Sequence, residues 1–237
     1  MENFAPRSGP KVVSMTSTAR VLIIAGSDSG GGAGIQADIK TVAMLGGHPM
    51  TAVTAVTAQN TLGVDAIHPI PAEVILAQID AVVADIGVDA VKIGMIGSAF
   101  AAKQVATRLQ ELKSLQPDIP IVFDPVMAAT SGGVLADDAT IAAFGRLMDV
   151  ATIATPNLPE LKRLTSEEDP VAAVAASSGY CDWHPTGKYQ STGEIERLCH
   201  KMTGNPSCFH CKQFPISGTI SEYRSGLFFA KDKSDSD

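Results

Sequence analysis

Apolar residues between 20 and 165 recur in two alternating patterns, which predict strands and helices in turn. Residues 21–25 form an unbroken apolar run, typical of a strand buried on both faces of a parallel sheet. Ile35, Ile39 and Val42 follow at helical spacing, and two glycines mark the end of that helix. The same patterns predict further strands at 51–57, 90–93, 120–123 and 151–154, and helices at 35–45, 71–86, 98–112, 137–148 and 158–164.

This alternation indicates an α/β domain built around a mostly parallel sheet, because short loops join each strand to the helix that covers it. Thr165-x-x-Glu168 has the form of a capping box and predicts one more helix from about Asp169. The regular pattern ends near residue 177. We therefore expect the sheet to be incomplete at its C-terminal side.

Composition also changes near residue 177. The four cysteines, the three tyrosines and the single tryptophan all lie beyond it, while the last 60 residues contain only five Ile, Val or Leu. We therefore divide the chain into a flexible N-terminal arm at 1–19, a domain at 20–177 and an atypical, irregular tail at 178–237. A frameshift or an alternative exon would produce such a break.

Charge and hydropathy exclude several classes of protein. The net charge is −7 and no run of basic residues exceeds two, so the electrostatic footprint of a nucleic-acid-binding protein is missing. No stretch approaches the roughly 18 continuous apolar residues that cross a membrane. Residues 1–19 lack the apolar segment of a secretory signal, and we expect a cytoplasmic protein. The sequence leaves open whether the chain forms a homodimer.

Candidate chemistry lies at the strand-to-helix junctions, since ligands of an open parallel sheet bind at the carboxyl ends of its strands. The first junction runs from Gly26 to Asp38 and is rich in glycine, which lets a ligand approach the backbone closely. It is not a phosphate-binding P-loop, because no Gly-Lys-Ser/Thr follows. A dinucleotide site would need an acidic residue at the end of the second strand, where Gln59 and Asn60 stand.

The later junctions place amide, thioether and carboxylate groups at the same edge. Gln59 offers a donor and an acceptor to a neutral nitrogen heterocycle, and Met95 is a flexible apolar side chain suited to covering a ring. Asp124 follows the fourth strand, and Asn157 opens the last short helix with Glu160 one turn in. Two such carboxylates would suit Mg²⁺, which takes one or two of them with phosphate oxygens and water. Each residue taken singly also fits a loop cap, a core side chain or a solvated charge.

Five segments in this order resemble the hydroxymethylpyrimidine/phosphomethylpyrimidine kinases of thiamine biosynthesis, in the ribokinase-like superfamily: AGSDSGGGAGIQADIKT, TAVTAQNT, KIGMIGS, FDPVM and TPNLPE. The resemblance covers about residues 20–165. It implies a three-layer α/β/α fold and the phosphorylation, by ATP with Mg²⁺, of 4-amino-5-hydroxymethyl-2-methylpyrimidine and then of its monophosphate. The matching positions imply a pyrimidine pocket lined by Gly26, Asp38, Gln59 and Met95, with Asp124, Asn157 and Glu160 serving the nucleotide phosphates and metal.

Two motifs of that family are absent from this sequence. Its members continue with a strand ending in Lys-Gly-Gly-His, and then with a His-Gly-Thr-Gly-Cys stretch that forms the anion hole and whose cysteine is taken as the base. The resemblance therefore assigns no catalytic residue here and implies impaired phosphoryl transfer. A pyridoxal-type kinase and a non-catalytic pyrimidine-binding protein stay open as alternatives. A nucleotide-binding oxidoreductase is disfavoured by the missing acidic residue after the second strand.

The sequence gives no functional role to the cysteines or to two of the histidines. Cys208-x-x-Cys211 is a single pair, whereas a structural zinc site usually needs two paired ligand sets, so we expect free thiols. His48 and His68 each precede a proline, and we interpret them as turn residues.

Overall fold

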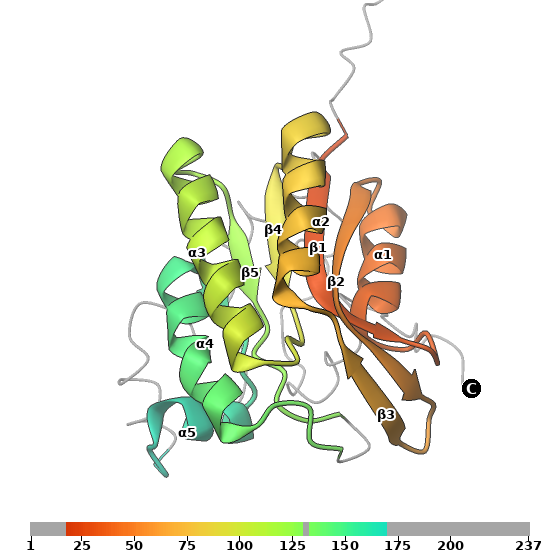
Figure 1. Ribbon diagram of the computed structural model, residues 1–237, viewed down its shortest axis with the longest axis vertical. Coiled ribbons are helices and arrows are strands. Elements are labelled where there is room, and N and C mark those ends of the chain that lie inside the picture. The colour runs from red at the N-terminus through yellow and green to blue at the C-terminus, as the bar shows by residue number, and fades with distance from the viewer. Residues whose placement is uncertain (1–17, 130–132, 170–237) are drawn as a thin grey trace, which may run out of the picture.

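A computed structural model describes residues 18–129 and 133–169 (Figure 1). The predicted tail at 178–237, the cysteines within it, the helix expected from about Asp169 and all but two residues of the predicted arm at 1–19 lie outside these ranges. In the part of the chain that the structure describes, no helix is long and apolar enough to cross a membrane.

Six strands form one sheet in the order β3-β2-β1-β4-β5-β6, and β3 alone among these described strands is antiparallel to its neighbour. The strands are β1 (Arg20–Asp28), β2 (His48–Gln59), β3 (Val64–Pro69), β4 (Ala90–Ile93), β5 (Ile121–Phe123) and β6 (Ile153–Ala154). The helices are α1 (Gly34–Met44), α2 (Ala72–Asp85), α3 (Ala99–Leu115), α4 (Asp138–Val150) and α5 (Leu158–Thr165). The predicted α/β fold with a mostly parallel sheet is confirmed.

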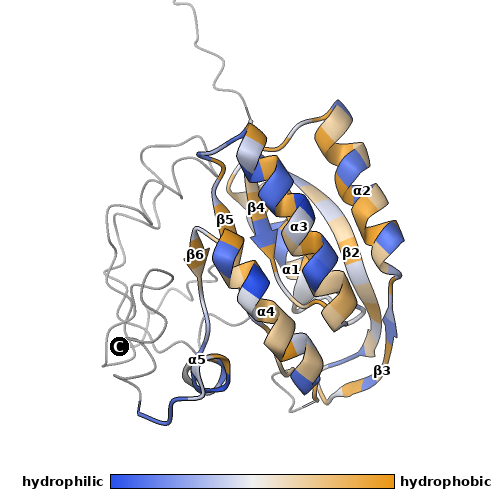
Figure 2. Cartoon of the chain, turned by 60° about the vertical axis from the view of Figure 1, so that its left-hand side comes forward, coloured by the Kyte–Doolittle hydropathy of each residue, from blue (hydrophilic) through white to orange (hydrophobic). Residues whose placement is uncertain are grey.

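Helices cover both faces of the sheet, which gives three layers. Figures 1 and 2 show α2, α3 and α4 on one face and α1 on the other. The alternation within β1 explains this arrangement, because Leu22 and Ile24 pack in the core formed with α2, α3 and α4, whereas Val21 and Ile23 pack toward α1. A strand buried on both faces needs an apolar residue at every position, as the sequence of β1 provides.

The strand β3 was not predicted, and the interpretation of two histidines was wrong. β3 pairs with the C-terminal half of β2, with Pro69 opposite Ala55, and most of the residues of β3 are exposed. His48 begins β2 and His68 lies within β3, so neither is a turn residue. Proline is tolerated near the start of a strand and on an edge strand, because no ladder hydrogen bond is lost there. A proline beside these histidines therefore does not mark a turn.

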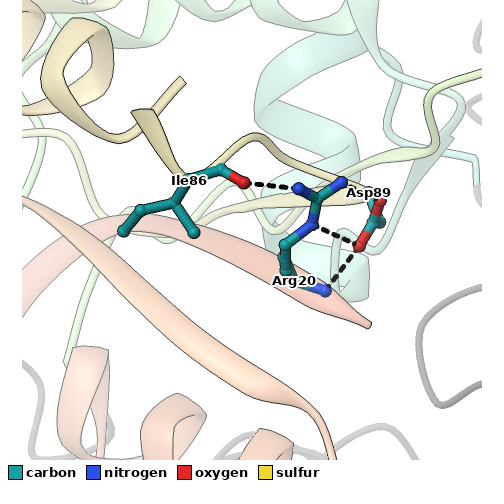
Figure 3. Close-up of polar contacts among 3 residues, drawn as sticks. All are labelled: Arg20, Ile86 and Asp89. Atoms are coloured by element: carbon teal, nitrogen blue, oxygen red, sulfur yellow. Dashed lines mark hydrogen bonds and ion pairs between the residues drawn. The ribbon is translucent and has the colours of Figure 1, made fainter. Parts of the chain in front are cut away.

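An ion pair joins β1 to the start of β4 at the amino end of the sheet (Figure 3). Arg20 donates from Nε and Nη2 to the Asp89 carboxylate over 2.9 and 2.7 Å, and its backbone N–H donates to the same carboxylate over 2.8 Å. Its Nη1 donates to the carbonyl of Ile86. The hydrogen bond from Arg20 lowers the pKa of Asp89, although partial burial acts in the opposite direction. This pair lies at the opposite end of the sheet from the predicted site.

Candidate active site

The sheet order reverses between β1 and β4, and these strands stop pairing before β1 ends. They pair only as far as Ile24 and Ile93, after which β1 continues along β2 to Asp28. In an open α/β sheet, ligands bind outside the carboxyl ends of the strands where the order reverses. We call this position, formed by Gly26 and the two residues after β4, the switch point.

The structure brings Gly26 and Met95 together at the switch point. The Met95 sulfur lies 3.2 Å from where a Cβ on Gly26 would stand, so a side chain at position 26 would displace the thioether. The Thr54 hydroxyl donates to the Met95 carbonyl over 2.6 Å and fixes the backbone there. Two of the residues expected to line the pyrimidine pocket are therefore neighbours, although they are far apart in the sequence.

The glycine-rich loop after β1 is organised by the carboxylate of Asp28, which is buried. Its two oxygens accept hydrogen bonds from the backbone N–H groups of Gly30, Gly32 and Ala33, at 2.8, 3.0 and 2.8 Å. The loop then enters α1 at Gly34, where φ is +54° and an added Cβ would stand 2.3 Å from the carbonyl oxygen of Gly26. Only glycine allows the start of α1 to lie this close to β1.

Gln59 lies at the carboxyl end of β2 and is tied to the same loop. The Ser29 hydroxyl donates to the Gln59 carbonyl over 2.7 Å and accepts from the Gln59 backbone N–H over 2.8 Å. The Thr57 hydroxyl donates to the Ser27 carbonyl over 2.9 Å and lies 3.2 Å from the Oε1 atom of Gln59. The backbone of Gln59 is thus positioned by its neighbours, and the residue is only partly buried.

Asp38 forms a buried ion pair with Lys92 across the interface of α1 and the sheet. Lys92 Nζ lies 2.7 Å from Asp38 Oδ2, and the two side chains are 14% and 7% exposed. Burial lowers the pKa of the Lys92 ammonium, but the charges of Asp38 and Asp124 and the hydrogen bond to Asp38 outweigh it and hold that pKa above its ordinary value. Asp38 therefore meets any ligand with one oxygen already engaged.

The junctions after β5 and β6 lie side by side, because Phe123 pairs with Ala154 in parallel. Asp124 follows β5 directly. Asn157 and Glu160 form a capping box at α5: Asn157 Oδ1 accepts from the Glu160 N–H over 3.0 Å, and Glu160 Oε2 accepts from the Asn157 N–H over 2.9 Å. Two of the three residues predicted to serve the nucleotide phosphates and metal thus stabilise the start of this helix.

The carboxylates at this edge of the sheet are compatible with a magnesium ion that is bound together with a nucleotide. In the described ranges there is no group of three or more His, Cys, Asp or Glu arranged to hold a metal by themselves. Asp124 follows β5 and Glu160 lies in the first turn of α5, after the neighbouring strand β6, and Mg²⁺ in phosphate-transfer sites takes one or two carboxylates with phosphate oxygens and water.

Sequence reasoning missed two side chains that hold this site together. Asp28 had a usable signal, because aspartate followed by small residues commonly accepts hydrogen bonds from the backbone just ahead of it. Lys92 also had one, since it is the only charged residue in a strand whose other members are Ala90, Val91 and Ile93. A charge within a fully buried strand requires a partner.

A family model described as phosphomethylpyrimidine kinase matches residues 28–178. The chain belongs to the phosphomethylpyrimidine kinase family. A hydroxymethylpyrimidine/phosphomethylpyrimidine kinase of Mycobacterium bovis is 48% identical over 167 residues, which are 70% of this chain and 58% of that protein. The chain thus spans less than two thirds of that relative. A Mycobacterium leprae protein of the same name is 48% identical over 236 residues, covering 94% of this chain and 81% of that protein, so this match extends beyond residue 177.

Solved structures of family members and relatives share the fold. A phosphomethylpyrimidine kinase from Clostridium difficile 630 matches with a TM-score of 0.58 and 39% identity, over 67% of this chain and 70% of that one. A Bacillus subtilis pyridoxal kinase, solved as an ADP complex, matches with a TM-score of 0.58 and 34% identity, over 68% of this chain and 62% of that one. The predicted ribokinase-like fold is confirmed by these neighbours.

Proposed function

We propose that this chain is an ATP-dependent kinase that phosphorylates 4-amino-5-hydroxymethyl-2-methylpyrimidine, and then its monophosphate, in thiamine biosynthesis. The observation that carries the proposal is the contact of Gly26 with Met95 at the switch point, in a chain of the phosphomethylpyrimidine kinase family. Gln59, at the end of the neighbouring strand β2, adds a carboxamide that can both donate to and accept from a heterocycle.

The described residues divide into two sets of roles. On the pyrimidine side, Met95 covers the ring, Gly26 lets the ring approach the backbone, and Gln59 hydrogen-bonds to its edge. On the phosphate side, Asp124 and Glu160 would hold Mg²⁺, which when bound neutralises charge on the phosphate oxygens. The chain's own contribution is to place the substrate hydroxyl in line with the terminal phosphate of ATP.

Turnover is expected to be slow. The two family motifs that supply the anion hole and the base are absent from the sequence, and stabilisation of the developing charge is usually the largest contribution to rate. A cytoplasmic location, a homodimer and the absence of nucleic-acid partners stay predictions from the sequence.

The test is a coupled ADP-release assay on the full chain with Mg-ATP, together with calorimetric titration of the pyrimidine. We expect binding of the pyrimidine and pyrimidine-dependent ADP release well below about 1 per second, the low end for kinases. The similarity to the Bacillus subtilis pyridoxal kinase favours pyridoxal as the second candidate substrate. ADP release with pyridoxal and none with the pyrimidine would assign that activity instead. Binding with no ADP release would identify a non-catalytic binding protein, and neither binding nor release would refute the proposal.

A further inference from the structure

Lys92 is a charge placed inside an apolar layer. It projects from β4 toward α1, on the same face as the buried residues Val21, Ile23 and Ala90, and its ammonium meets Asp38 at 2.7 Å. Both side chains are almost fully enclosed. Removing two charges from water costs free energy that their mutual attraction often only just offsets, so an apolar pair of similar size would hold α1 to the sheet at least as well. Stability alone therefore does not account for this pair.

The Lys92 ammonium lies close to the switch point. Lys92 Nζ lies 2.9 Å from where a Cβ on Gly94 would stand, and Gly94 directly precedes Met95. The lysine side chain thus extends along β4 toward its carboxyl end, where the strand parts from β1. Any side chain at position 94 would push the ammonium away from this place.

The ammonium is also influenced by one residue from each predicted set of site residues. Asp38 on α1 belongs to the expected pyrimidine pocket, Asp124 after β5 belongs to the expected phosphate side, and the charges of both act on Lys92. Lys92 thus carries the positive charge that pairs with Asp38, and Asp124 also attracts that charge.

We propose that Lys92 is a positioning residue for the pyrimidine site, whose ammonium holds the Asp38 carboxylate in the orientation that the pocket uses. This inference rests on the proposed function. It assigns a role to Lys92 that acts through Asp38, and no direct contact of Lys92 with the substrate is required. Removal of the charge should weaken binding of the pyrimidine without weakening binding of the nucleotide.

The experiment measures two affinities by calorimetry, for the pyrimidine and for Mg-ADP, together with the thermal midpoint, in the full chain and in variants. Lys92→Met should lose about tenfold or more in pyrimidine affinity, as expected for a displaced charged hydrogen-bonding group, while its Mg-ADP affinity is not reduced. Lys92→Arg keeps the charge and should recover part of the loss. Should Lys92→Met fail to fold, Lys92→Gln keeps a donor toward Asp38 without the charge and takes its place with the same expectation.

Arg20→Met is the control, because the pair of Arg20 with Asp89 is also an ion pair that involves the β4 region, but it lies at the other end of the sheet. It should lower the thermal midpoint and leave both affinities unchanged. Unaltered pyrimidine affinity in the folded Lys92 variant would overturn the inference, as would equal losses in Lys92→Met and Lys92→Arg. Equal affinity losses in Lys92→Met and Arg20→Met would also overturn it, since stability would then explain both. A wild-type chain that does not bind the pyrimidine would refute the proposed function as well, whereas the preceding outcomes leave that function standing.

Discussion

At the scale of a single side chain, substitution of Gln59 tests ligand recognition separately from stability. Its backbone is held by Ser29, and its partly buried carboxamide interacts with the Thr57 hydroxyl. Gln59→Ala should weaken pyrimidine binding by about 1–3 kcal/mol, because the ligand loses a buried hydrogen bond, while the thermal midpoint hardly moves. Calorimetry of the folded variant measures the first quantity.

Gln78→Ala provides the opposite pattern as a control. The Gln78 side chain on α2 accepts from the Val53 N–H over 2.9 Å, at a part of β2 that β3 does not pair with. Its removal should lower stability and leave the affinity unchanged. If Gln59→Ala leaves the pyrimidine affinity unaltered, Gln59 does not belong to the site.

Glu160 combines a helix cap with a proposed role at the metal, and one substitution separates them. Glutamine also serves at the third position of a capping box, so Glu160→Gln should retain the stability of α5 while losing a negative ligand. Affinity for Mg-ADP should fall by roughly tenfold or more, and affinity for the pyrimidine should stay the same. Asp137→Asn is the control, because Asp137 caps α4 through the Thr140 N–H and should leave Mg-ADP binding intact. A variant that binds Mg-ADP like the wild type would limit Glu160 to capping.

The elements of this fold were predictable in proportion to how completely each is buried. The apolar run in β1 and the stripe on α2 identify their elements directly, since burial forces the pattern. The edge strand β3 was not predicted, because its residues face solvent and show no alternation of apolar and polar positions. Among the candidate site residues, the proximity of Gly26 to Met95 follows from the sheet order. The ion pair of Asp38 with Lys92 does not, because the sequence does not show which charges a helix and a distant strand will bring together.

The close approach of the start of α1 to β1 gives a prediction at the scale of secondary-structure elements. Gly34 has φ of +54°, and an added Cβ would stand 2.3 Å from the Gly26 carbonyl oxygen. Gly34→Ala should therefore combine backbone strain of about 1–3 kcal/mol with a displacement of α1, and should also weaken pyrimidine binding at Gly26. Chemical denaturation and calorimetry measure the two effects.

Gly46→Ala is its control, with φ of +81° and no atom within 4 Å of the added Cβ. It carries the backbone cost alone, so it should lower stability by about 1–2 kcal/mol and leave binding unchanged. Equal losses of stability and of affinity in the two variants would show that the close approach to Gly26 has no consequence.

Across the whole sheet, the two ends of β1 and β4 serve different purposes. At the amino end, Arg20 and Asp89 hold the strands together with side-chain and backbone hydrogen bonds. At the carboxyl end the pairing of β1 with β4 stops after Ile24, and the Met95 side chain lies beside Gly26. The contacts at the amino end fix the register of the two strands up to the point where they diverge, and a binding site is held more precisely on such rigid elements than on loops.

The amino-end ion pair also makes the stability of the whole molecule depend on pH. The hydrogen bond from Arg20 lowers the pKa of Asp89 in the folded chain, so the pair stabilises the fold at pH values above the ordinary carboxyl pKa. This contribution is lost as the pH falls through the lowered value, because the carboxyl is then protonated in both the folded and the unfolded chain. Asp89→Asn should therefore reduce the free energy of unfolding at pH 7 by at most about 1 kcal/mol, since both side chains are more than a third exposed. The difference from the wild type should shrink below about pH 4 and in high salt. Urea denaturation of both proteins at pH 7 and near pH 3 measures it, and a difference of the same size at both values would show that the charge of Asp89 contributes nothing.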